Sequence, residues 1–269
     1  MKNFIHIIST RFNVPTEIWE MTRDGKKPLS DEWLEDRFEI FRQYCLPSFK
    51  NQSEKNFIWL VFFDKQTPEK YLKIIYEIEK ECKQFKPMFV QDFPEMNSKI
   101  HKLIPKYFEE TTEFIITTDI DNDDMLHKDF IKTVQCLFQP KHNLVIDLRK
   151  GLQLTIFDGC KAFANTFYMV SNPFVSLVEN ISDFKSVIKE SHPNYRNYEN
   201  QVFYDQKPMF IQFIHQFNLL NQTNFKNKRL FHFPHKDFGI NSPKFEISVL
   251  DTALFNIKRS FNLILKKLN

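Results

Sequence analysis

The sequence predicts an α/β protein built on a mostly parallel, doubly wound sheet with helices on both faces. Apolar runs alternate with amphipathic segments through the first 140 residues, in four successive strand-then-helix pairs. This alternation favours parallel strands joined by right-handed crossovers. The fourth apolar run ends in a group of carboxylates, at the sheet edge where open α/β sheets bind ligands.

Strands and helices of the first half are marked by their apolar periodicity. Four runs are expected to be buried strands: residues 4–8, 57–63, 88–90 and 114–120. Four amphipathic segments are expected to be helices: residues 31–46, 67–82, 98–108 and 130–137. Thr67-Pro68 and Ser98 supply start signals, Pro47 is expected to end the first helix, and residues 13–30 form a long loop.

The second half is less regular. Two apolar runs, 143–148 and 152–157, flank Gly151 and predict a hairpin. Further elements are expected to be strands at 167–170 and 209–215 and helices at 172–178 and 183–189. Residues 248–268 fit an amphipathic helix with basic residues off its apolar face. We expect it to dock on the core with its lysines in solvent; contact with an anionic lipid surface is the alternative.

Composition narrows the class of protein. The 269 residues include 37 basic and 34 acidic side chains, a balance that gives no indication of nucleic-acid binding. Only 4 glycines are present, which excludes a glycine-rich phosphate loop. The 4 cysteines are widely spaced and are expected to be buried free thiols, and no run is long enough to span a membrane. We expect a cytoplasmic protein that can touch the inner membrane surface.

Four carboxylates follow the fourth apolar run within six residues: Asp119, Asp121, Asp123 and Asp124. Like charges this close need a counter-charge, and Mn²⁺ and Mg²⁺ prefer such hard oxygen ligands. The alternative is that one of these residues only caps the next helix. We favour a cation at this strand end, because a single Asp would be enough for a cap.

Other polar residues are expected near this cluster. Arg11 and Asp64 follow the first and second strands, so right-handed crossovers bring them to the same edge. His215 ends a later strand and is a candidate metal ligand, although a lone histidine is more often structural. These residues could share one cleft with the carboxylates.

Several short motifs also carry a family resemblance. They are Thr10-Arg11-Phe12-Asn13, Trp33-Leu34 to Arg37-Phe38, Cys45-Leu46-Pro47-Ser48 running into Gln52, Phe57 to Asp64, Asp121-Asn122-Asp123-Asp124, Asn172 to Glu179, and Ile214 to Asn218. Together they resemble the bacterial putative rhamnosyltransferase family, a group of GT-A-type glycosyltransferases related to the family-two-like enzymes. The resemblance covers residues 4 to about 220 and is loosest after Gly151.

The resemblance implies a GT-A-like single domain over residues 1–220, with a nucleotide-sugar half (1–140) and an acceptor half (141–220). A C-terminal extension with the amphipathic helix would follow at 221–269. The family's DxD motif falls on Asp121 and Asp123, which implies a Mn²⁺ or Mg²⁺ site. Thr10, Arg11 and Asp64 match positions that face the nucleotide, with Asp121. Asp119 departs from the pattern, which has a basic or neutral residue at this position, and its extra negative charge would tighten metal binding or weaken diphosphate binding.

The implied function is metal-dependent transfer of a sugar from a nucleoside diphosphate to a glycan, a lipid-linked glycan or another hydroxyl acceptor. The family's description implies rhamnose as the sugar, and surface polysaccharide synthesis as the process. An inverting enzyme needs a base for the acceptor hydroxyl. The candidates are Asp158, Glu179, Asp183, His192 and Glu199. We favour Glu179, which the family motif reaches, with His192 in reserve. Alternatives are a sugar nucleotidyltransferase-like enzyme and a non-catalytic carbohydrate-binding protein; a phosphatase fits less well, because its Asp-x-Asp belongs to the first strand.

Overall fold

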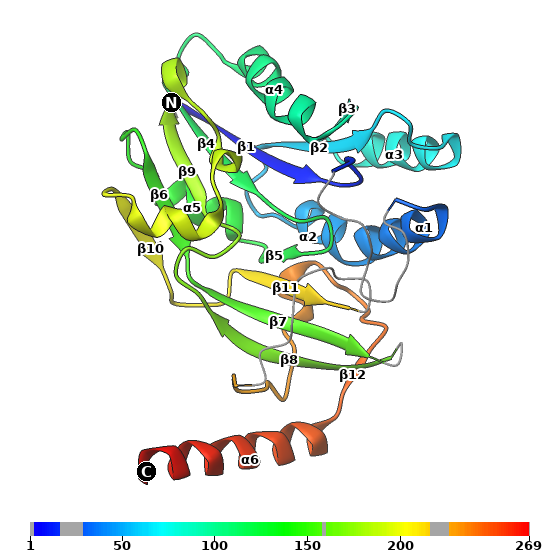
Figure 1. Ribbon diagram of the computed structural model, residues 1–269, viewed down its shortest axis with the longest axis vertical. Coiled ribbons are helices and arrows are strands. Elements are labelled where there is room, and N and C mark those ends of the chain that lie inside the picture. Colours follow the sequence, from blue (N-terminus) through cyan, green and yellow to red (C-terminus); the bar gives the residue numbers. More distant parts are fainter. Residues whose placement is uncertain (1–2, 17–28, 158–159, 216–225, 269) are drawn as a thin grey trace.

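The computed structural model describes residues 3–16, 29–157, 160–215 and 226–268, with side chains up to residue 265 in the last helix. Within these residues the strands form two sheets (Figure 1). The seven-stranded sheet has the order β10 (Gln201–Tyr204), β6 (Leu144–Leu148), β9 (Ser176–Asn180), β4 (Phe114–Asp119), β1 (Phe4–Arg11), β2 (Ile58–Asp64) and β3 (Phe85–Val90). The five-stranded sheet has the order β12 (Glu246–Ile247), β8 (Lys161–Tyr168), β7 (Lys150–Phe157), β11 (Phe210–Ile214) and β5 (Met125–Leu126).

The helices cover both faces of the larger sheet. They are α1 (Asp31–Ile40), α2 (Leu46–Lys50), α3 (Glu69–Glu81), α4 (Phe93–Leu103) and α5 (Phe130–Cys136), whereas α6 (Val249–Leu268) lies beyond the smaller sheet (Figure 1). A π-helical turn (Phe41–Cys45) joins α1 to α2. Short 3₁₀ turns are Ile104–Tyr107, Ile181–Asp183, Val187–Lys189, His192–Asn197 and His235–Phe238.

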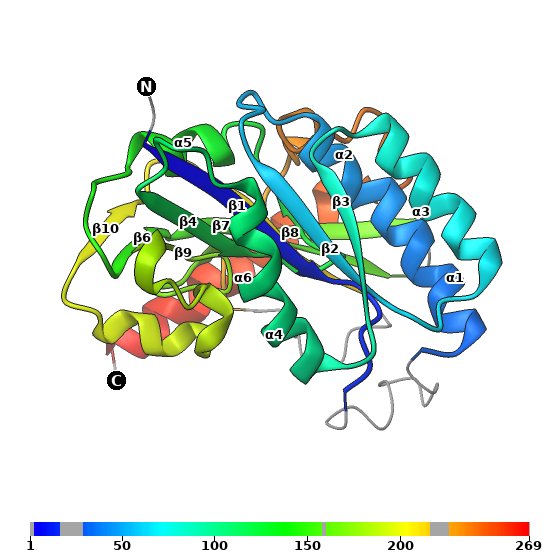
Figure 2. The same cartoon turned by 90° about the horizontal axis from the view of Figure 1, so that it is seen from above.

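The centre of the larger sheet is parallel, as predicted. β1 lies between β2 and β4 and runs parallel to both, and β2 runs parallel to β3 (Figure 2). Therefore the carboxyl ends of β1, β2 and β4 meet at one edge. β9 is antiparallel to both β4 and β6. The helix predicted at 172–178 is wrong, because this segment enters the sheet as β9.

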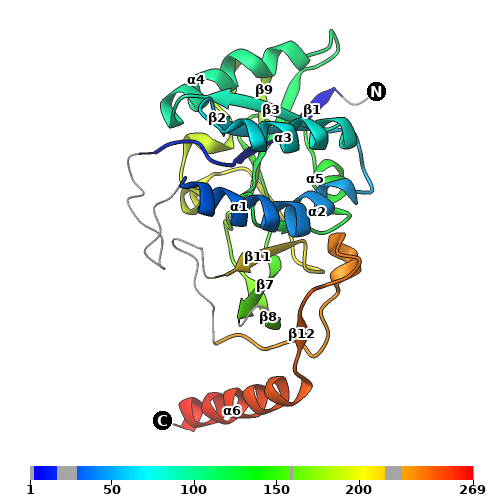
Figure 3. The same ribbon diagram turned by 90° about the vertical axis from the view of Figure 1, so that its right-hand side faces the viewer.

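Alternation along β2 explains why helices pack on both faces. Trp59, Val61 and Phe63 belong to the core under α1, α2, α3 and α5, whereas Leu60 and Phe62 belong to the core under α4. Figure 3 shows α4 on the opposite side of the sheet from α1 and α3. A strand buried on both faces must be apolar throughout, which is why 57–63 could be recognised as a strand.

Two helix boundaries differ from the prediction. The first helix does not end at Pro47, because the chain stays helical through the π turn and continues into α2, which contains Pro47 in its first turn. α4 begins at Phe93 rather than at Ser98, because the Asp92 side chain accepts a hydrogen bond from the backbone N–H of Glu95.

The smaller sheet corrects the predictions for the second half. β6 and β7 lie in different sheets, so the hairpin predicted around Gly151 is wrong, and β7 pairs instead with β8. The helix predicted at 183–189 is replaced by two 3₁₀ turns. Residues 226–247 contribute β12 and the buried Phe233 and Phe245 to the core of this sheet. The boundary predicted between residues 220 and 221 lies outside the described residues.

Gly151 is required by close packing between β7 and β11. A Cβ atom at this position would lie 2.2 Å from a ring carbon of Phe210. That ring cannot move aside easily, because Phe210 is fully buried and packs on Phe174 with ring centroids 4.4 Å apart. We expect Gly151→Ala to lower the free energy of unfolding by about 1–3 kcal/mol, as overpacking typically does. Chemical denaturation measures this, and unchanged stability would show that the two strands can separate.

The tail forms α6, as predicted, but the side chains of its apolar face do not pack on the core. Leu250, Leu254, Ile257, Phe261 and Ile264 are all exposed. The expectation that this helix docks through its apolar face is therefore wrong. No helix in the described part of the chain has the length and apolar character needed to cross a bilayer.

The four cysteines carry free thiols. Cys45 and Cys82 are buried, as expected, whereas Cys136 and Cys160 are exposed.

Candidate functional site

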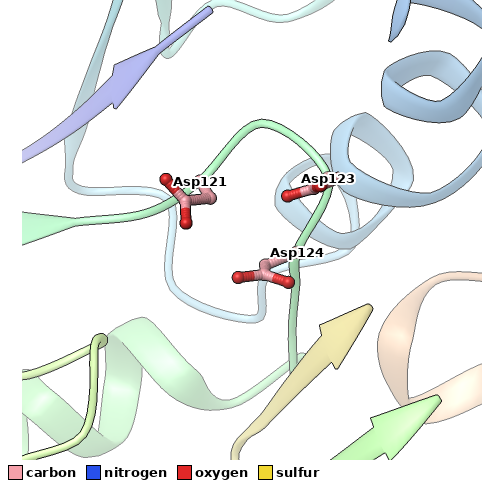
Figure 4. A group of neighbouring side chains, drawn as sticks. All are labelled: Asp121, Asp123 and Asp124. Atoms are coloured by element: carbon pink, nitrogen blue, oxygen red, sulfur yellow. The ribbon is translucent and has the colours of Figure 1, made fainter. Parts of the chain in front are cut away.

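The site lies where the two sheets meet, in the turn between β4 and β5. β4 ends at Asp119, and the turn closes through a hydrogen bond from the backbone N–H of Asp124 to the carbonyl of Asp121, at 3.3 Å. One carboxylate oxygen from each of Asp121, Asp123 and Asp124 lies within 4.8 Å of the others (Figure 4). The clustering predicted from the sequence is therefore present, with Asp124 as a third member.

The Asp123 carboxylate is held by the side chains of Arg37 and His215. Its Oδ2 accepts hydrogen bonds from Arg37 Nη1 at 2.7 Å and from His215 Nε2 at 3.0 Å. All three side chains are buried. Burial opposes ionisation of Asp123, but the charge of Arg37 and the contact with His215 lower the pKa of this carboxyl to about 2. Asp123 is therefore a carboxylate at neutral pH.

The other two carboxyls are less well compensated. Asp124 Oδ1 accepts from the backbone N–H of Phe213 at 2.8 Å, yet burial and the nearby Asp123 and Asp121 raise the pKa of Asp124 well above its usual value. Asp121 reaches solvent, but loss of water on its protein side and the charges of Asp123 and Asp119 raise its pKa to about 6. The cluster therefore favours additional positive charge.

Asn122 fastens this turn to the end of β1. Its Nδ2 donates to the carbonyls of Arg11 at 3.1 Å and Phe12 at 2.8 Å, while its Oδ1 accepts from Arg37 Nη1 at 2.9 Å. Arg37 thus holds both Asn122 and Asp123 from α1. Sequence reasoning gave Arg37 no role, although it stands in the motif that begins at Trp33.

A cavity of about 240 Å³ opens beside the cluster, bordered by Asp121, Asp119, Arg11, His192 and Glu190 among others. Apolar residues complete the wall: Phe93, Met96, Pro173, Phe174, Val175, Val187, Ile188 and Tyr195. Burial raises the pKa of Asp119, although Ser9 Oγ donates to it at 2.6 Å and Arg11 also favours its charge. The cavity therefore combines anionic, cationic and apolar surfaces. The sequence did not single out Glu190, which also borders this cavity.

His192 has a fixed orientation in this cavity. Its Nδ1 lies 2.8 Å from the carbonyl oxygen of Ser171, and Ser171 Oγ donates in return to the carbonyl of His192. A carbonyl only accepts, so Nδ1 of the neutral ring carries the hydrogen and Nε2 keeps a lone pair. Ser171 adopts a left-handed conformation (φ 54°), and Asp147 Oδ2 accepts its backbone N–H at 2.9 Å.

Glu179 is not among the residues that border the cavity. It is fully buried in β9, and its two oxygens accept from the backbone N–H groups of Lys185 at 3.0 Å and Ser186 at 2.9 Å. Lys189 Nζ lies 3.4 Å from the same carboxylate. These contacts hold the turn at 185–189. They give Glu179 a structural task that its place in the family motif did not reveal.

The remaining predicted residues are divided between the site and the core. Arg11 and Asp121 border the cavity. Thr10 is buried, and its Oγ1 accepts from Trp59 Nε1 at 2.9 Å, so it faces the core. Asp64 ends β2 but uses Oδ1 to accept from the backbone N–H of Gln66. Neither of these two is among the residues that border the cavity.

The other candidate bases are placed as follows. Asp183 and Glu199 are exposed and do not border the cavity. Asp158 lies outside the described residues.

Several solved structures resemble this chain at a distance. S. aureus TarS 1-349 in complex with UDP-GlcNAc is 12% identical, with a TM-score of 0.47 over 96% of this chain and 71% of that one. S. aureus TarS 1-349 alone is 14% identical, with a TM-score of 0.45 over 79% of this chain and 60% of that one. This chain therefore covers less than two thirds of that fragment. A putative nucleotide-diphospho-sugar transferase from Desulfovibrio desulfuricans G20 is 10% identical, with a TM-score of 0.37 over 77% of this chain and 84% of that one. Likenesses this distant carry no argument about the site.

A search of curated proteins found no significant match. The family model described as "Putative rhamnosyl transferase" matches residues 6–227, which is most of the chain and includes the strand ends, the Asp cluster and His192. The resemblance found from the motifs is thereby confirmed, and the chain belongs to the putative rhamnosyl transferase family of glycosyltransferases.

Proposed function

We propose that this protein is a metal-dependent glycosyltransferase that moves a sugar from a nucleoside diphosphate to a hydroxyl group of a glycan or lipid-linked glycan. One observation carries the proposal. Asp121, Asp123 and Asp124 have ligand atoms within 4.8 Å of one another, and Asp121 borders a cavity that also presents Arg11 and His192. Family membership supports the same chemistry. Rhamnose as the sugar, a role in surface polysaccharide synthesis and a cytoplasmic location belong to the same proposal.

The Asp cluster suits a divalent cation. Asp121, Asp123 and Asp124 offer carboxylate oxygens, the ligands that Mn²⁺ and Mg²⁺ prefer, and their mutual repulsion is relieved when a cation binds. When bound, the cation would neutralise charge on the departing diphosphate. His215 was predicted as a ligand from the sequence. Because it donates to Asp123, we propose that it orients that carboxylate instead.

Arg11 is the residue we propose for contact with the donor diphosphate. Arg11 borders the cavity together with Asp119 and Asp121, and its guanidinium lies over the ring of Phe93, 5.4 Å from its centroid. A cation there adds to the charge that the Asp cluster attracts. Asp64, at the end of the neighbouring strand, remains our proposal for contact with the base or ribose. Thr10 would act indirectly, by holding Trp59 beneath the strand end.

His192 is the residue we propose as the general base. Its Nε2 carries the lone pair, and the ring borders the cavity that contains Arg11 and Asp121. Glu179, favoured from the sequence, has both oxygens engaged by backbone N–H groups and is the weaker candidate. With His192 taking its proton, the acceptor oxygen would bond directly to the anomeric carbon on the face opposite the bond that breaks to the diphosphate, and this single displacement would invert the sugar's configuration.

The test is a product assay on the full chain with Mn²⁺ or Mg²⁺. A panel of nucleotide sugars is incubated with candidate acceptors, and the released nucleotide is identified by chromatography. We expect nucleoside diphosphate, formed faster with acceptor and lost when the cation is removed with EDTA. Release of pyrophosphate from a nucleoside triphosphate and a sugar phosphate would identify a nucleotidyltransferase. Binding without any release would identify a carbohydrate-binding protein.

A further inference from the structure

Helix α6 presents a continuous apolar stripe to solvent. Leu250, Leu254, Ile257, Phe261 and Ile264 follow one another at spacings of four and three residues, which places them on one side of a helix. Their side chains are between 57% and 68% exposed. A contiguous exposed apolar surface of this length typically marks a site of interaction with a protein or a membrane.

Contacts on the opposite side of the helix fix its rotation. Asn256 accepts from the backbone N–H of Arg229 and donates to its carbonyl, both at 2.9 Å, and Arg259 Nε donates to the carbonyl of Lys226 at 2.6 Å. The Arg229 guanidinium lies 3.9 Å from the ring centroid of Phe255. α6 is therefore seated on the protein through the side that carries Phe255, Asn256 and Arg259, so the apolar stripe is directed outward.

The position of α6 leaves the stripe accessible along its length. The helix lies across one end of the molecule, beyond β8 and β12, in two perpendicular views (Figures 1 and 3). A flat surface approaching that end would meet the helix lengthwise rather than at its tip.

The charge of the segment indicates which surface that is. Residues 249–268 contain four basic residues, Lys258, Arg259, Lys266 and Lys267, against one acidic residue, Asp251. Lys258 is exposed and directly follows Ile257 of the stripe. Two copies of this helix would bring like charges together, whereas an anionic bilayer carries the opposite charge. We propose that α6 docks the protein on an anionic lipid surface, with the apolar stripe in the headgroup region.

This proposal is independent of the proposed function, because it concerns binding in the absence of any donor. The test is co-sedimentation of the full chain with vesicles of phosphatidylcholine, alone or mixed equally with phosphatidylglycerol. We expect binding to the mixed vesicles, weaker binding to phosphatidylcholine alone, and loss at high salt. Leu254→Glu with Ile257→Glu should weaken binding by more than about a hundredfold, because two apolar side chains no longer insert.

Matched variants separate this surface from general effects. Tyr76→Glu changes an exposed apolar side chain on α3 and should bind vesicles normally. Lys258→Gln should weaken binding about fivefold, the effect of one basic residue near an anionic surface, whereas Lys80→Gln should not. These single-charge variants keep the apolar stripe intact, so they test the proposal even if the double Glu variant folds poorly. Circular dichroism checks folding in every case.

Two results would overturn the proposal. One is that the wild-type protein does not sediment with the mixed vesicles, or that the Leu254→Glu, Ile257→Glu variant sediments with them equally well. The other is a lipid-free dimer that the Leu254→Glu, Ile257→Glu variant converts to a monomer in sedimentation velocity. A second copy of the chain would then cover the stripe.

Discussion

Asp121→Asn is expected to reduce sugar transfer by about a thousandfold, comparable to the loss of a key group that stabilises transition-state charge. Asp121 borders the cavity and belongs to the carboxylate cluster, so its charge acts where the diphosphate would leave. An amide is a neutral and weaker ligand for a hard cation. Initial rates at saturating donor and increasing Mn²⁺ measure the effect, and turnover near the wild-type rate would remove Asp121 from the metal site.

The same substitution should leave the fold as stable as before or slightly more stable. The pKa of Asp121 is raised to about 6 in the folded protein, so its ionisation disfavours folding as the pH rises through that value. A neutral Asn avoids this cost. Thermal melting of the cation-free protein at neutral pH should therefore show an unchanged or higher Tm.

Asp123 provides the informative contrast, because it has a structural partner as well. Asp123→Ala would leave the buried Arg37 without its carboxylate, a loss that typically costs about 3–5 kcal/mol. We expect this variant to lose activity and stability together, whereas Asp121→Asn loses activity alone. Asp183→Asn, at an exposed carboxylate in a 3₁₀ turn, is the control and should change neither.

The first half of the fold could be predicted because its signals are local. Along 57–63 every residue is apolar, and the structure shows alternate side chains such as Leu60 and Val61 buried in cores on opposite faces. The position of Asp121 and Asp123 follows from the same logic, since a parallel strand that ends in carboxylates places them at the edge where ligands bind. Right-handed crossovers then bring Arg11 to the same cavity.

The second half could not be predicted because its structure depends on long-range pairing. Asn172-Pro173 was interpreted as a helix start, but Asn172 Oδ1 accepts from the backbone N–H of Phe174 and its Nδ2 donates to Asp147 at 2.8 Å. The same dipeptide serves a turn as well as a helix cap. The residues that follow form β9 between β4 and β6, and no pattern within residues 172–178 reveals those partners.

Choosing between carboxylates also required the three-dimensional structure. Glu179 was favoured because a motif reaches it, yet its partners are backbone N–H groups six and seven residues further along the chain. Asp124 was predicted only as one of four clustered carboxylates, and the structure places it with Asp121 and Asp123, whereas nothing in the sequence singled out Glu190, which borders the cavity. Residue type and local motif indicated the chemistry but not which member of a set performs it.

His192→Gln is expected to lower acceptor-dependent transfer by about 10²–10⁴-fold, the usual contribution of a general base. The glutamine side chain keeps much of the size and polarity of histidine but cannot take a proton. Donor binding should be nearly unchanged, because the proposed diphosphate contact is Arg11. The measurement is therefore a pair: kcat from transfer assays, and the donor dissociation constant from calorimetry with the cation present.

Ser171→Gly is the matched control for the orientation of His192. Glycine accepts the left-handed conformation at this position and retains the carbonyl that receives Nδ1–H, so only the Oγ contact disappears. We expect kcat within about tenfold of the wild-type value, since the loss of one neutral hydrogen bond is worth about 1 kcal/mol. A loss as large as that of His192→Gln would mean that the hydroxyl itself takes part.

Glu179→Gln decides between the two candidate bases. A glutamine amide cannot accept from both backbone N–H groups that now meet the carboxylate, so one buried donor is left unpaired, at a cost of about 1–3 kcal/mol. We expect a lower Tm but normal acceptor-dependent transfer per folded molecule. If transfer instead falls by orders of magnitude while His192→Gln remains active, Glu179 is the base. The turn at 185–189 must then open during the reaction, because a carboxylate engaged in this way cannot reach an acceptor hydroxyl in the cavity.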